Sequence, residues 1–269
     1  MKQKVIVWIV CAAGLVGLAA PASAQYGARG LGRPVAGENY HVELSLNFWN
    51  PEREIVIASE SLGIVGTSID AVADLGFEKK TFRDFRVVLR PSRKFKFRFG
   101  YTPIQYEADT ILSRTIVFNG QRYDIGLPVQ SQLDWKAWRF GLQYDFLYAE
   151  RGFLGFVAEA KYTDVNVELN SPITSEFANV KAPIPTIGVA GRVYVARNVA
   201  INGELTGLKL AYEDNEGTYV DFDLGATVNI GNHFGVQGGY KSLNVDYVID
   251  DDLGDFNLKG LYFGGTVRF

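Results

Sequence analysis

The sequence predicts an all-β fold, a transmembrane up-and-down antiparallel β-barrel of about ten strands, with about eight strands as the alternative. Apolar and polar residues alternate in one short segment after another, which is the pattern of strands with two different faces. The 14 tyrosines, 18 phenylalanines and 29 glycines are spread along the chain, and no long apolar run follows residue 24. The mean hydropathy of zero also fits, because lipid-facing and lumen-facing residues cancel in the average.

The amino end predicts a secretory signal peptide over residues 1–24. Lys2 and Lys4 precede an apolar run, and the small residues 22–24 form a cleavage site. The apolar run is short for a membrane-spanning helix. Cys11, the only cysteine, lies inside it, so the mature chain is expected to contain no thiol. Cleavage removes two lysines, so 25 of the 27 basic residues remain against 30 acidic residues. The sequence shows no basic face, so a nucleic-acid partner is not expected.

The first predicted strands show the alternation clearly. Residues 85–90 and 95–101 have apolar side chains at every second position around a tight turn at 91–94, which predicts a hairpin. In residues 42–57 the apolar positions change parity after Pro51. This change predicts a β-bulge at the proline, where a missing N–H group is tolerated.

Two longer connections carry signals of their own. Asn119 and Gly120, in the middle of residues 110–132, are the strongest short hairpin signal in the chain. We expect them to close two strands that extend beyond the membrane. Residues Ser61–Lys80 have apolar positions at near-helical spacing, so they are expected to form either a short helix over or in the barrel mouth or an irregular external loop. An even strand number places both chain ends on one side.

Charged residues share the strand face opposite the aromatic residues. Each lysine or arginine that faced lipid near mid-depth would cost about 2–4 kcal/mol, and several together would offset the stability of a typical fold. A soluble secreted β-fold with a conventional core is the alternative. In a membrane barrel the charges must line the lumen as an ion-pair network, which we predict to consist of Glu43, Asp84, Arg86, Arg98, Arg139, Asp145, Glu159, Lys161, Arg192, Glu204, Asp221, Asp223 and Lys241.

The two signs in this set nearly balance, so we expect a lumen closed by ion pairs, because an unpaired charge in a confined interior is costly. Barrels of about eight strands are filled by side chains, whereas open channels need roughly sixteen. A narrow passive channel for small solutes is the alternative. Glycines on or near the inward face would leave space for it, although they also relieve crowding where strands bend: Gly155, Gly188, Gly239 and Gly264.

Catalysis and metal binding are not expected. A general base that works near neutral pH is most often a histidine. The two histidines, His41 and His233, lie at the start of the first strand and in a short turn, away from the predicted external rim. The acidic stretches 213–216 and 250–255 could supply oxygen ligands, but their spacing does not match an EF-hand and solvated loops are expected. We predict no catalytic residue, cofactor or metal site, with a lipid-modifying enzyme as the less favoured alternative.

The carboxyl end resembles the insertion signal of bacterial outer-membrane β-barrels, with an aromatic last residue and the signal residues Leu261, Phe263, Val267 and Phe269 on one parity. Together with the export signal, the chain resembles small outer-membrane barrels of the OmpA, OmpX and OmpW type. The resemblance implies a periplasmic segment at 25–40 and an outer-membrane barrel at 41–269. It also implies insertion by the barrel-assembly machinery, contact with outer-membrane lipid and lipopolysaccharide, a monomer, and a structural or envelope and surface-interaction role.

Overall fold

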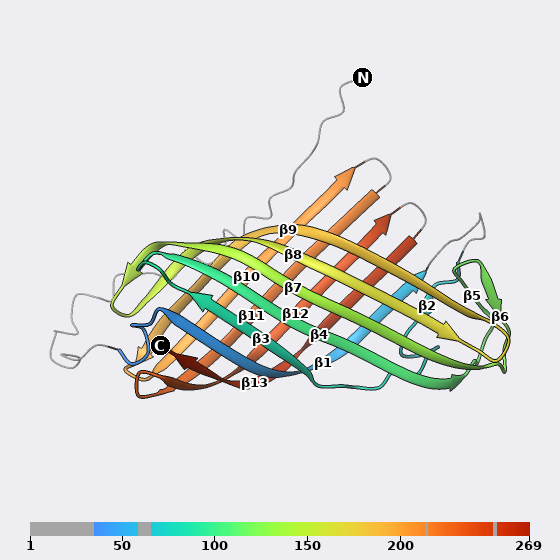
Figure 1. Cartoon of the computed structure of the whole chain (residues 1–269), viewed down its shortest axis with the longest axis horizontal. Helices are drawn as coiled ribbons and strands as arrows, with labels where there is room; N and C mark the ends of the chain where they lie inside the picture. Colours follow the sequence, from blue (N-terminus) through green and yellow to red (C-terminus); the bar gives the residue numbers. More distant parts are fainter. Residues whose placement is uncertain (1–34, 59–65, 213–214, 250–251) are drawn as a thin grey trace, which may run out of the picture.

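The computed structural model describes residues 35–58, 66–212, 215–249 and 252–269. In this part of the chain ten long strands form one antiparallel sheet that closes on itself, because β13 pairs with β1. The strands run diagonally around the wall (Figure 1). The predicted fold class and the count of ten are confirmed. The strands are β1 (Val42–Ala58), β3 (Phe82–Leu89), β4 (Phe95–Ile111), β7 (Pro128–Ala149), β8 (Gly152–Asn170), β9 (Ser175–Ala196), β10 (Val199–Tyr212), β11 (Asn215–Ile230), β12 (Phe234–Ile249) and β13 (Asp252–Arg268).

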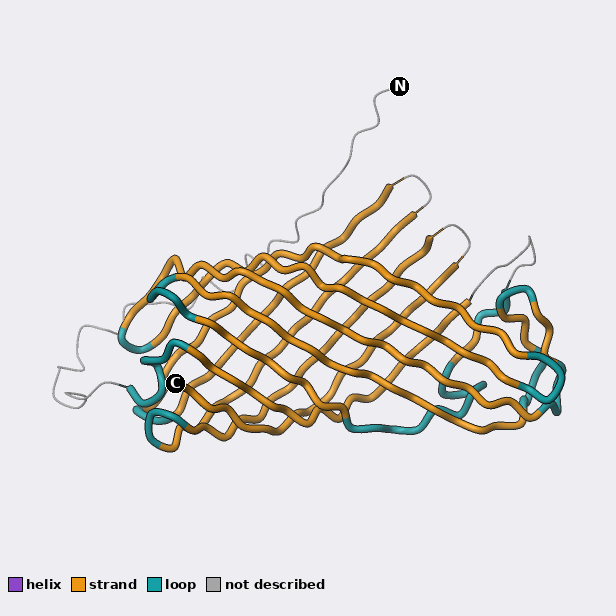
Figure 2. The backbone as a smooth tube through the Cα atoms, in the orientation of Figure 1, coloured by secondary structure: helices purple, strands orange, loops and turns teal. Residues whose placement is uncertain are grey.

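The two ends of the barrel differ in their connections. One end holds the last residue and the short turns (Figure 2), and we call it the terminal end. The backbone N–H of His41 donates to the carbonyl oxygen of Phe269 at 2.6 Å there, so the first strand starts beside the end of the chain. The opposite end, with the long connections 59–81 and 112–127, is called the loop end. No helix in the described residues is long and apolar enough to cross a membrane, and the predicted signal peptide 1–24 lies outside them.

The outer surface nearer the terminal end is apolar on every wall strand. Its border toward the loop end includes an aromatic row, in which Tyr101, Trp138 and Tyr162 lie opposite one another on β4, β7 and β8. The rings of Tyr101 and Trp138 stack with centroids 4.1 Å apart. We call this band the apolar belt, and it comprises the outward residues of 42–48, 85–89, 95–101, 138–147, 154–162, 187–195, 199–207, 222–230, 234–240 and 261–269.

The predicted β-bulge at Pro51 is wrong. β1 pairs with β13 without a register shift from Glu43 opposite Arg268 to Ala58 opposite Leu253. Pro51 is tolerated because the pairing of β1 with β3 ends at Trp49, so the side of the strand that lacks the N–H group has no partner there. The strand keeps its parity, and the chemistry of its two faces is exchanged instead.

Toward the loop end, apolar side chains point inward and polar side chains point outward, which is the reverse of the arrangement nearer the terminal end. Ile55 and Ile57 point inward and are buried, whereas Glu52 and Glu54, which precede them on the strand, point outward and are exposed. The same exchange occurs on the facing wall, where Trp135 is buried. The interior of the loop-end half is therefore an ordinary hydrophobic core, and the outer surface there is polar.

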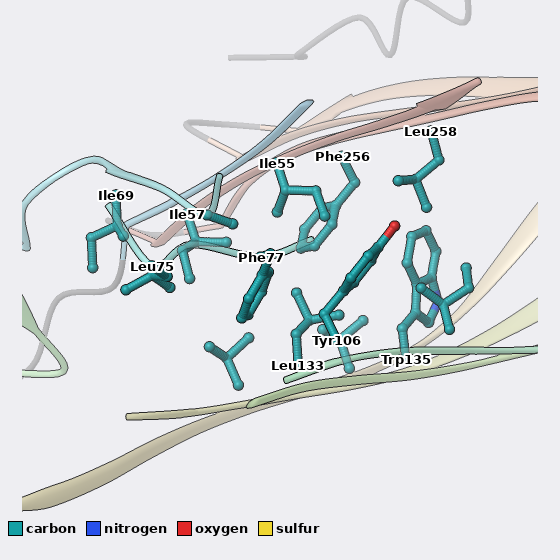
Figure 3. Packing of buried hydrophobic residues seen from close by; sticks show 14 of the residues in the cluster. Ile55, Ile57, Ile69, Leu75, Phe77, Tyr106, Leu133, Trp135, Phe256 and Leu258 are labelled. Carbon is teal, nitrogen blue, oxygen red and sulfur yellow. The ribbon is translucent and has the colours of Figure 1, made fainter. Parts of the chain in front are cut away.

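The connection after β1 supplies part of this core. The described part of the predicted segment Ser61–Lys80 forms no helix, but a two-residue strand, β2 (Ile69–Asp70), followed by a turn. Figure 3 shows Phe77 and Tyr106 lying side by side between the two walls, and their rings stack with centroids 5.5 Å apart. The segment thus fills the mouth with apolar side chains, of which Ile69, Ala71, Leu75 and Phe77 are buried.

The second long connection forms the predicted tight turn. Asn119 and Gly120 have φ angles of 50° and 77°, and they close the hairpin of β5 (Ile116–Phe118) and β6 (Gln121–Tyr123). The sequence predicts that this turn closes the extended strands β4 and β7, but the hairpin is a separate two-stranded sheet. Ile116, Phe118 and Tyr123 are buried, so the hairpin covers the core from the loop end.

The barrel wall opens between β9 and β10 above the belt. β9 pairs with β8 as far as Ser175, but its pairing with β10 stops at Ile187 opposite Gly207. Pro183 and Pro185 explain the stop. Both pair within the β8 ladder, so the sides of the backbone that lack N–H groups face β10. The ladder to β10 cannot continue past them.

Replacing both prolines by valine is expected to extend the β9–β10 ladder toward the loop end. We would introduce cysteines at Ile184 and Leu210, which would come opposite each other three steps beyond the last pair, Ile187 and Gly207, if the ladder continued. A disulfide should form in the P183V/P185V background and not beside the native prolines, as measured by gel migration with and without reductant. Equal cross-linking in both backgrounds would contradict the role of the prolines.

Candidate functional site

The interior nearer the terminal end is a continuous network of charged side chains. Every residue of the predicted lumen network points into the barrel, is buried or half-buried, and makes at least one ion pair. The network has the composition that the strand parity predicts, because each wall strand contributes its inward polar residues. Arg90, Lys96 and Arg268 belong to the same network.

Asp84 of β3 is the most highly connected carboxylate. Its oxygens lie 2.6 Å from Arg86 Nε, 3.1 Å from Lys241 Nζ and 3.5 Å from Arg139 Nη2. The Thr102 hydroxyl donates a further hydrogen bond at 2.7 Å. The Asp84 side chain is 1 % exposed. A single buried acid is therefore shared by cations from three strands.

Two neighbouring carboxylates of β11 extend the network across the barrel. Asp221 lies 2.9 Å from Lys161 Nζ and 3.3 Å from Arg139 Nη1. Asp223 lies 2.6 Å from Arg86 Nη2, so Arg86 bridges it to the β3 carboxylate. Arg98 of β4 pairs with Glu204 and, at 3.6 Å, with Glu159. Lys96, also of β4, pairs with Asp145 at 2.8 Å. The ion pairs thus cross-link strands that are not neighbours in the sheet.

The terminal mouth is closed by a segment that sequence reasoning missed. Residues 35–40 precede β1 and lie in the mouth, where Glu38 pairs with Arg90 at 3.4 Å and Arg192 at 3.6 Å. The Tyr194 hydroxyl donates to the same carboxylate at 3.1 Å. Glu38 and Tyr40 are each 5 % exposed. The sequence gives no signal for this role, because these residues have no strand periodicity.

The inward glycines do not provide a passage. A side-chain carbon at Gly188 would clash with the Leu205 carbonyl oxygen, and one at Gly264 with the Leu46 carbonyl oxygen. The space beside these glycines is occupied by the neighbouring strand, so they allow close packing and contribute no open lumen. The argument for a narrow channel from Gly155, Gly188, Gly239 and Gly264 therefore fails, since all four meet a neighbouring strand in this way.

One polar cavity of about 100 Å³ remains among the charged side chains. Tyr40 lines it on the terminal side, with Arg98, Arg192 and Glu204 around it. A cavity of this size has room for more than one water molecule. Arg192 Nη1 and Glu204 Oε1 have no hydrogen-bond partner in the described part of the protein, and such waters would satisfy them.

No family model and no curated protein matches the chain. Among solved structures, the outer-membrane protease OmpT from Escherichia coli superimposes with a TM-score of 0.54 at 8% identity, over 85% of this chain and 96% of OmpT. The fold is that of bacterial outer-membrane β-barrels. Ail of Yersinia pestis gives a TM-score of 0.38 at 10% identity (85% and 99% covered), and the toluene transporter TodX of Pseudomonas putida gives 0.34 at 7% (85% and 90% covered).

The predicted insertion residues lie on the outer surface of this outer-membrane-type barrel. Leu261, Phe263 and Phe269 are 64–70% exposed, and Val267 shares their face on β13. They are therefore accessible from outside the closed barrel, as recognition of such a signal requires. Their alternation with buried residues such as Tyr262 and Arg268 follows from the two-residue period of the strand.

The histidines lie where the sequence places them, at the terminal end. His41 Nδ1 is 3.3 Å from the Arg90 carbonyl oxygen, and His233 Nδ1 is 2.9 Å from the Arg268 carbonyl oxygen. Each ring is thus tied to a backbone group of the turn region. Within the described residues no group of three or more histidine, cysteine, aspartate or glutamate side chains could hold a metal ion.

A salt bridge holds residues 66–81, which we call the mouth segment because they fill the barrel mouth at the loop end. Arg114 donates from Nε to Asp74 Oδ1 at 2.7 Å and from Nη2 to Asp74 Oδ2 and to the Ser68 carbonyl oxygen at 2.5 and 2.6 Å. Asp74 Oδ2 also accepts the Asp70 backbone N–H at 2.8 Å. The hydrogen bonds from Arg114 lower the pKa of the Asp74 carboxyl below its ordinary value, although partial burial opposes this.

The stabilisation from this salt bridge should disappear only in acid. A carboxyl with a lowered folded-state pKa stabilises the fold above its unfolded pKa of about 3.9 and loses that contribution as the pH falls through the folded value. Hydrogen exchange of the 66–81 amides, corrected for intrinsic rates, should show constant protection from neutral pH to about pH 4 and a loss below it. R114Q should show low protection throughout. The same acid-dependent loss in R114Q would contradict the assignment to this pair.

Proposed function

We propose that this protein is an integral outer-membrane β-barrel with a non-conducting lumen, serving the envelope or the cell surface through its loop end. The observation that carries the proposal is the filled interior. The segment 35–40 occupies the terminal mouth, the ion-pair network occupies the middle, and the hydrophobic core with residues 66–81 occupies the loop-end half. A solute would have to displace charged pairs and a packed core in turn.

The apolar belt supports the membrane location. Its outward residues are aliphatic or aromatic residues and glycines on all ten wall strands, and none is charged. The run 154–162 of β8 and the run 261–269, at the end of β13 and the residue after it, reach the about 9–11 residues that a tilted strand needs to cross a bilayer. The stacked Tyr101 and Trp138 lie at one border, where aromatic side chains fit the interface. In water so large an exposed apolar surface would cause aggregation.

Recording from planar bilayers tests the lumen directly. We expect the purified, heat-modifiable protein to give no discrete conductance steps, whereas an open general porin reconstituted in parallel gives them. Because charged residues fill the middle layer, the absence of steps should persist at high salt, where exposed ion pairs would be screened but buried pairs are not. Reproducible steps in the folded protein would overturn the closed-lumen proposal in favour of the narrow channel.

The proposal includes no enzymatic activity. The printed name of OmpT describes that protein as a protease, but both histidines of this chain lie at the terminal end, tied to backbone carbonyl groups. The loop-end rim thus has no histidine to act as a general base. Folded protein in lipopolysaccharide-containing vesicles should cleave neither a peptide library nor phospholipid, with active OmpT as the control. Turnover that disappears on unfolding would contradict this part of the proposal.

The proposal also includes partners. We propose that the barrel is inserted by the barrel-assembly machinery, contacts outer-membrane lipid and lipopolysaccharide through the belt and its loop-end border, and is a monomer. The exposed insertion residues Phe263 and Phe269 support the first point. Deletion of Phe269 should reduce assembled, heat-modifiable protein in outer-membrane fractions, whereas alanine at the exposed Glu54 on the polar outer surface should not. Sedimentation in matched-density detergent checks the oligomeric state.

A further inference from the structure

A groove of about 490 Å³ lies at the loop-end tips of β4, β7 and β8. Its volume falls within the range of roughly 300–1,000 Å³ in which proteins bind small molecules. The groove touches the hydrophobic core through Val129 and lies outside the ion-pair network, so the closed-lumen proposal does not use it. It is lined by residues 109–111, 128–130 and 170–172.

Three polar side chains of the groove stand in one row across three strands. Asp109 of β4 lies opposite Gln130 of β7, which lies opposite Asn170 of β8. Neighbouring strands are about 4.8 Å apart, so the row presents a carboxylate and two amides at regular spacing. Asp109 and Gln130 have no hydrogen-bond or ion-pair partner in the described part of the chain, so their polar atoms are available.

Apolar surfaces lie directly beside this row. Ile111 is 69% exposed and pairs with Pro128 one step toward the loop end, and Pro172 lies on the turn after β8. The groove therefore combines groups that both donate and accept hydrogen bonds with flat apolar patches. A sugar ring has the complementary pattern, with hydroxyl groups around its edge and C–H groups on its faces.

Other ligand classes fit less well. Asp109 is the only charged residue that lines the groove, so a phosphate or sulfate would meet a negative charge and no cation. A hard metal ion prefers about six to eight oxygen ligands, and no group of three candidate side chains exists in the described residues. A purely apolar ligand would leave the Asp109 carboxylate and the Gln130 amide desolvated without partners, whereas Asn170 Oδ1 already accepts a hydrogen bond from the Ser175 hydroxyl.

We propose that this groove binds a neutral saccharide. The polar outer surface below it continues the pattern toward the belt, with Glu107, Gln132 and Glu168 in the next row. A longer saccharide could follow these rows, whereas one or two rings occupy the groove itself. That the groove meets surface saccharides in the cell rests on the proposed outward orientation of the loop end. The binding itself does not depend on that orientation.

Saturation-transfer difference NMR on the folded full-length mature protein tests the site. The detergent must carry no sugar headgroup, and the probes are maltotriose, cellotriose and glucose 6-phosphate. We expect saturation transfer to at least one neutral trisaccharide and weaker transfer to the phosphorylated sugar. The D109A/Q130A variant should bind the trisaccharide about tenfold more weakly or worse, because two hydrogen-bonding side chains are lost. Both substitutions are at exposed positions, so the fold should persist, as heat-modifiable migration would show.

The matched control is E52A, which removes an exposed carboxylate from β1 on another part of the polar outer surface. Binding should be unchanged in E52A. Absence of transfer to both neutral trisaccharides, preference for the phosphorylated sugar, or equal binding by D109A/Q130A and the native protein would each overturn the saccharide site. None of these results alters the conductance test, so failure of the site and failure of the closed-lumen proposal remain distinguishable.

Discussion

Replacing Asp84 by alanine is expected to destabilise the barrel by about 3–5 kcal/mol, because it leaves buried cations without their shared counter-charge. Arg86, Lys241 and Arg139 all lie within 3.5 Å of this carboxylate, which is 1 % exposed. Removal of one partner of a buried pair costs far more than the pair contributes, since the remaining charges cannot regain their hydration. Urea unfolding in lipid vesicles, followed by tryptophan fluorescence, measures the change.

Two further variants identify the cause of the loss. D84N keeps the shape and can still accept the hydrogen bond from Thr102, so a large loss there must come from the missing charge. E54A removes a carboxylate of an exposed pair, with Lys259 at 3.5 Å, and should cost less than about 1 kcal/mol. If D84A and E54A lost equal stability, the interior would be hydrated and the description of a filled lumen would be wrong.

The parity of the strands made the wall and the network predictable. A two-residue period places Arg98 and Lys96 on the face opposite Phe97 and Phe99, and closure of the sheet then directs one face inward. The sequence alone could not pair Asp84 with Lys241, because that contact depends on the register of strands distant in the chain. Membership of the network was therefore predictable, and its connectivity was not.

The loop-end half could not be predicted in the same way. A change of apolar parity along β1 has two physical explanations, a bulge that rotates the strand or an environment that exchanges inside and outside. Sequence reasoning chose the bulge at Pro51, and the continuous pairing with β13 shows the second explanation. The segment 35–40 also escaped prediction, and for residues 61–80 the sequence left open a helix over or in the mouth and an external loop, since tertiary contacts and not local periodicity fix both positions.

Replacing Ile55 by glutamate should be among the most damaging single changes in the loop-end half, with an expected loss of about 4 kcal/mol or more. Ile55 is 1 % exposed, lies opposite Phe256 on β13, and belongs to the apolar core shown in Figure 3. A carboxyl group there would have to ionise without a partner or remain protonated at neutral pH, and both are costly. Urea unfolding of the folded barrel gives the magnitude.

The neighbouring residue on the same strand provides the decisive control. Glu54 has a side chain that is 67% exposed and points away from the core, so E54I should change the free energy of unfolding by less than about 1 kcal/mol. A bulge at Pro51 would reverse the two positions and direct residue 54 inward. Tolerance of I55E together with damage by E54I would thus support the bulge. Damage by I55E together with tolerance of E54I would support an unbroken strand, along which the barrel interior changes from charged to apolar.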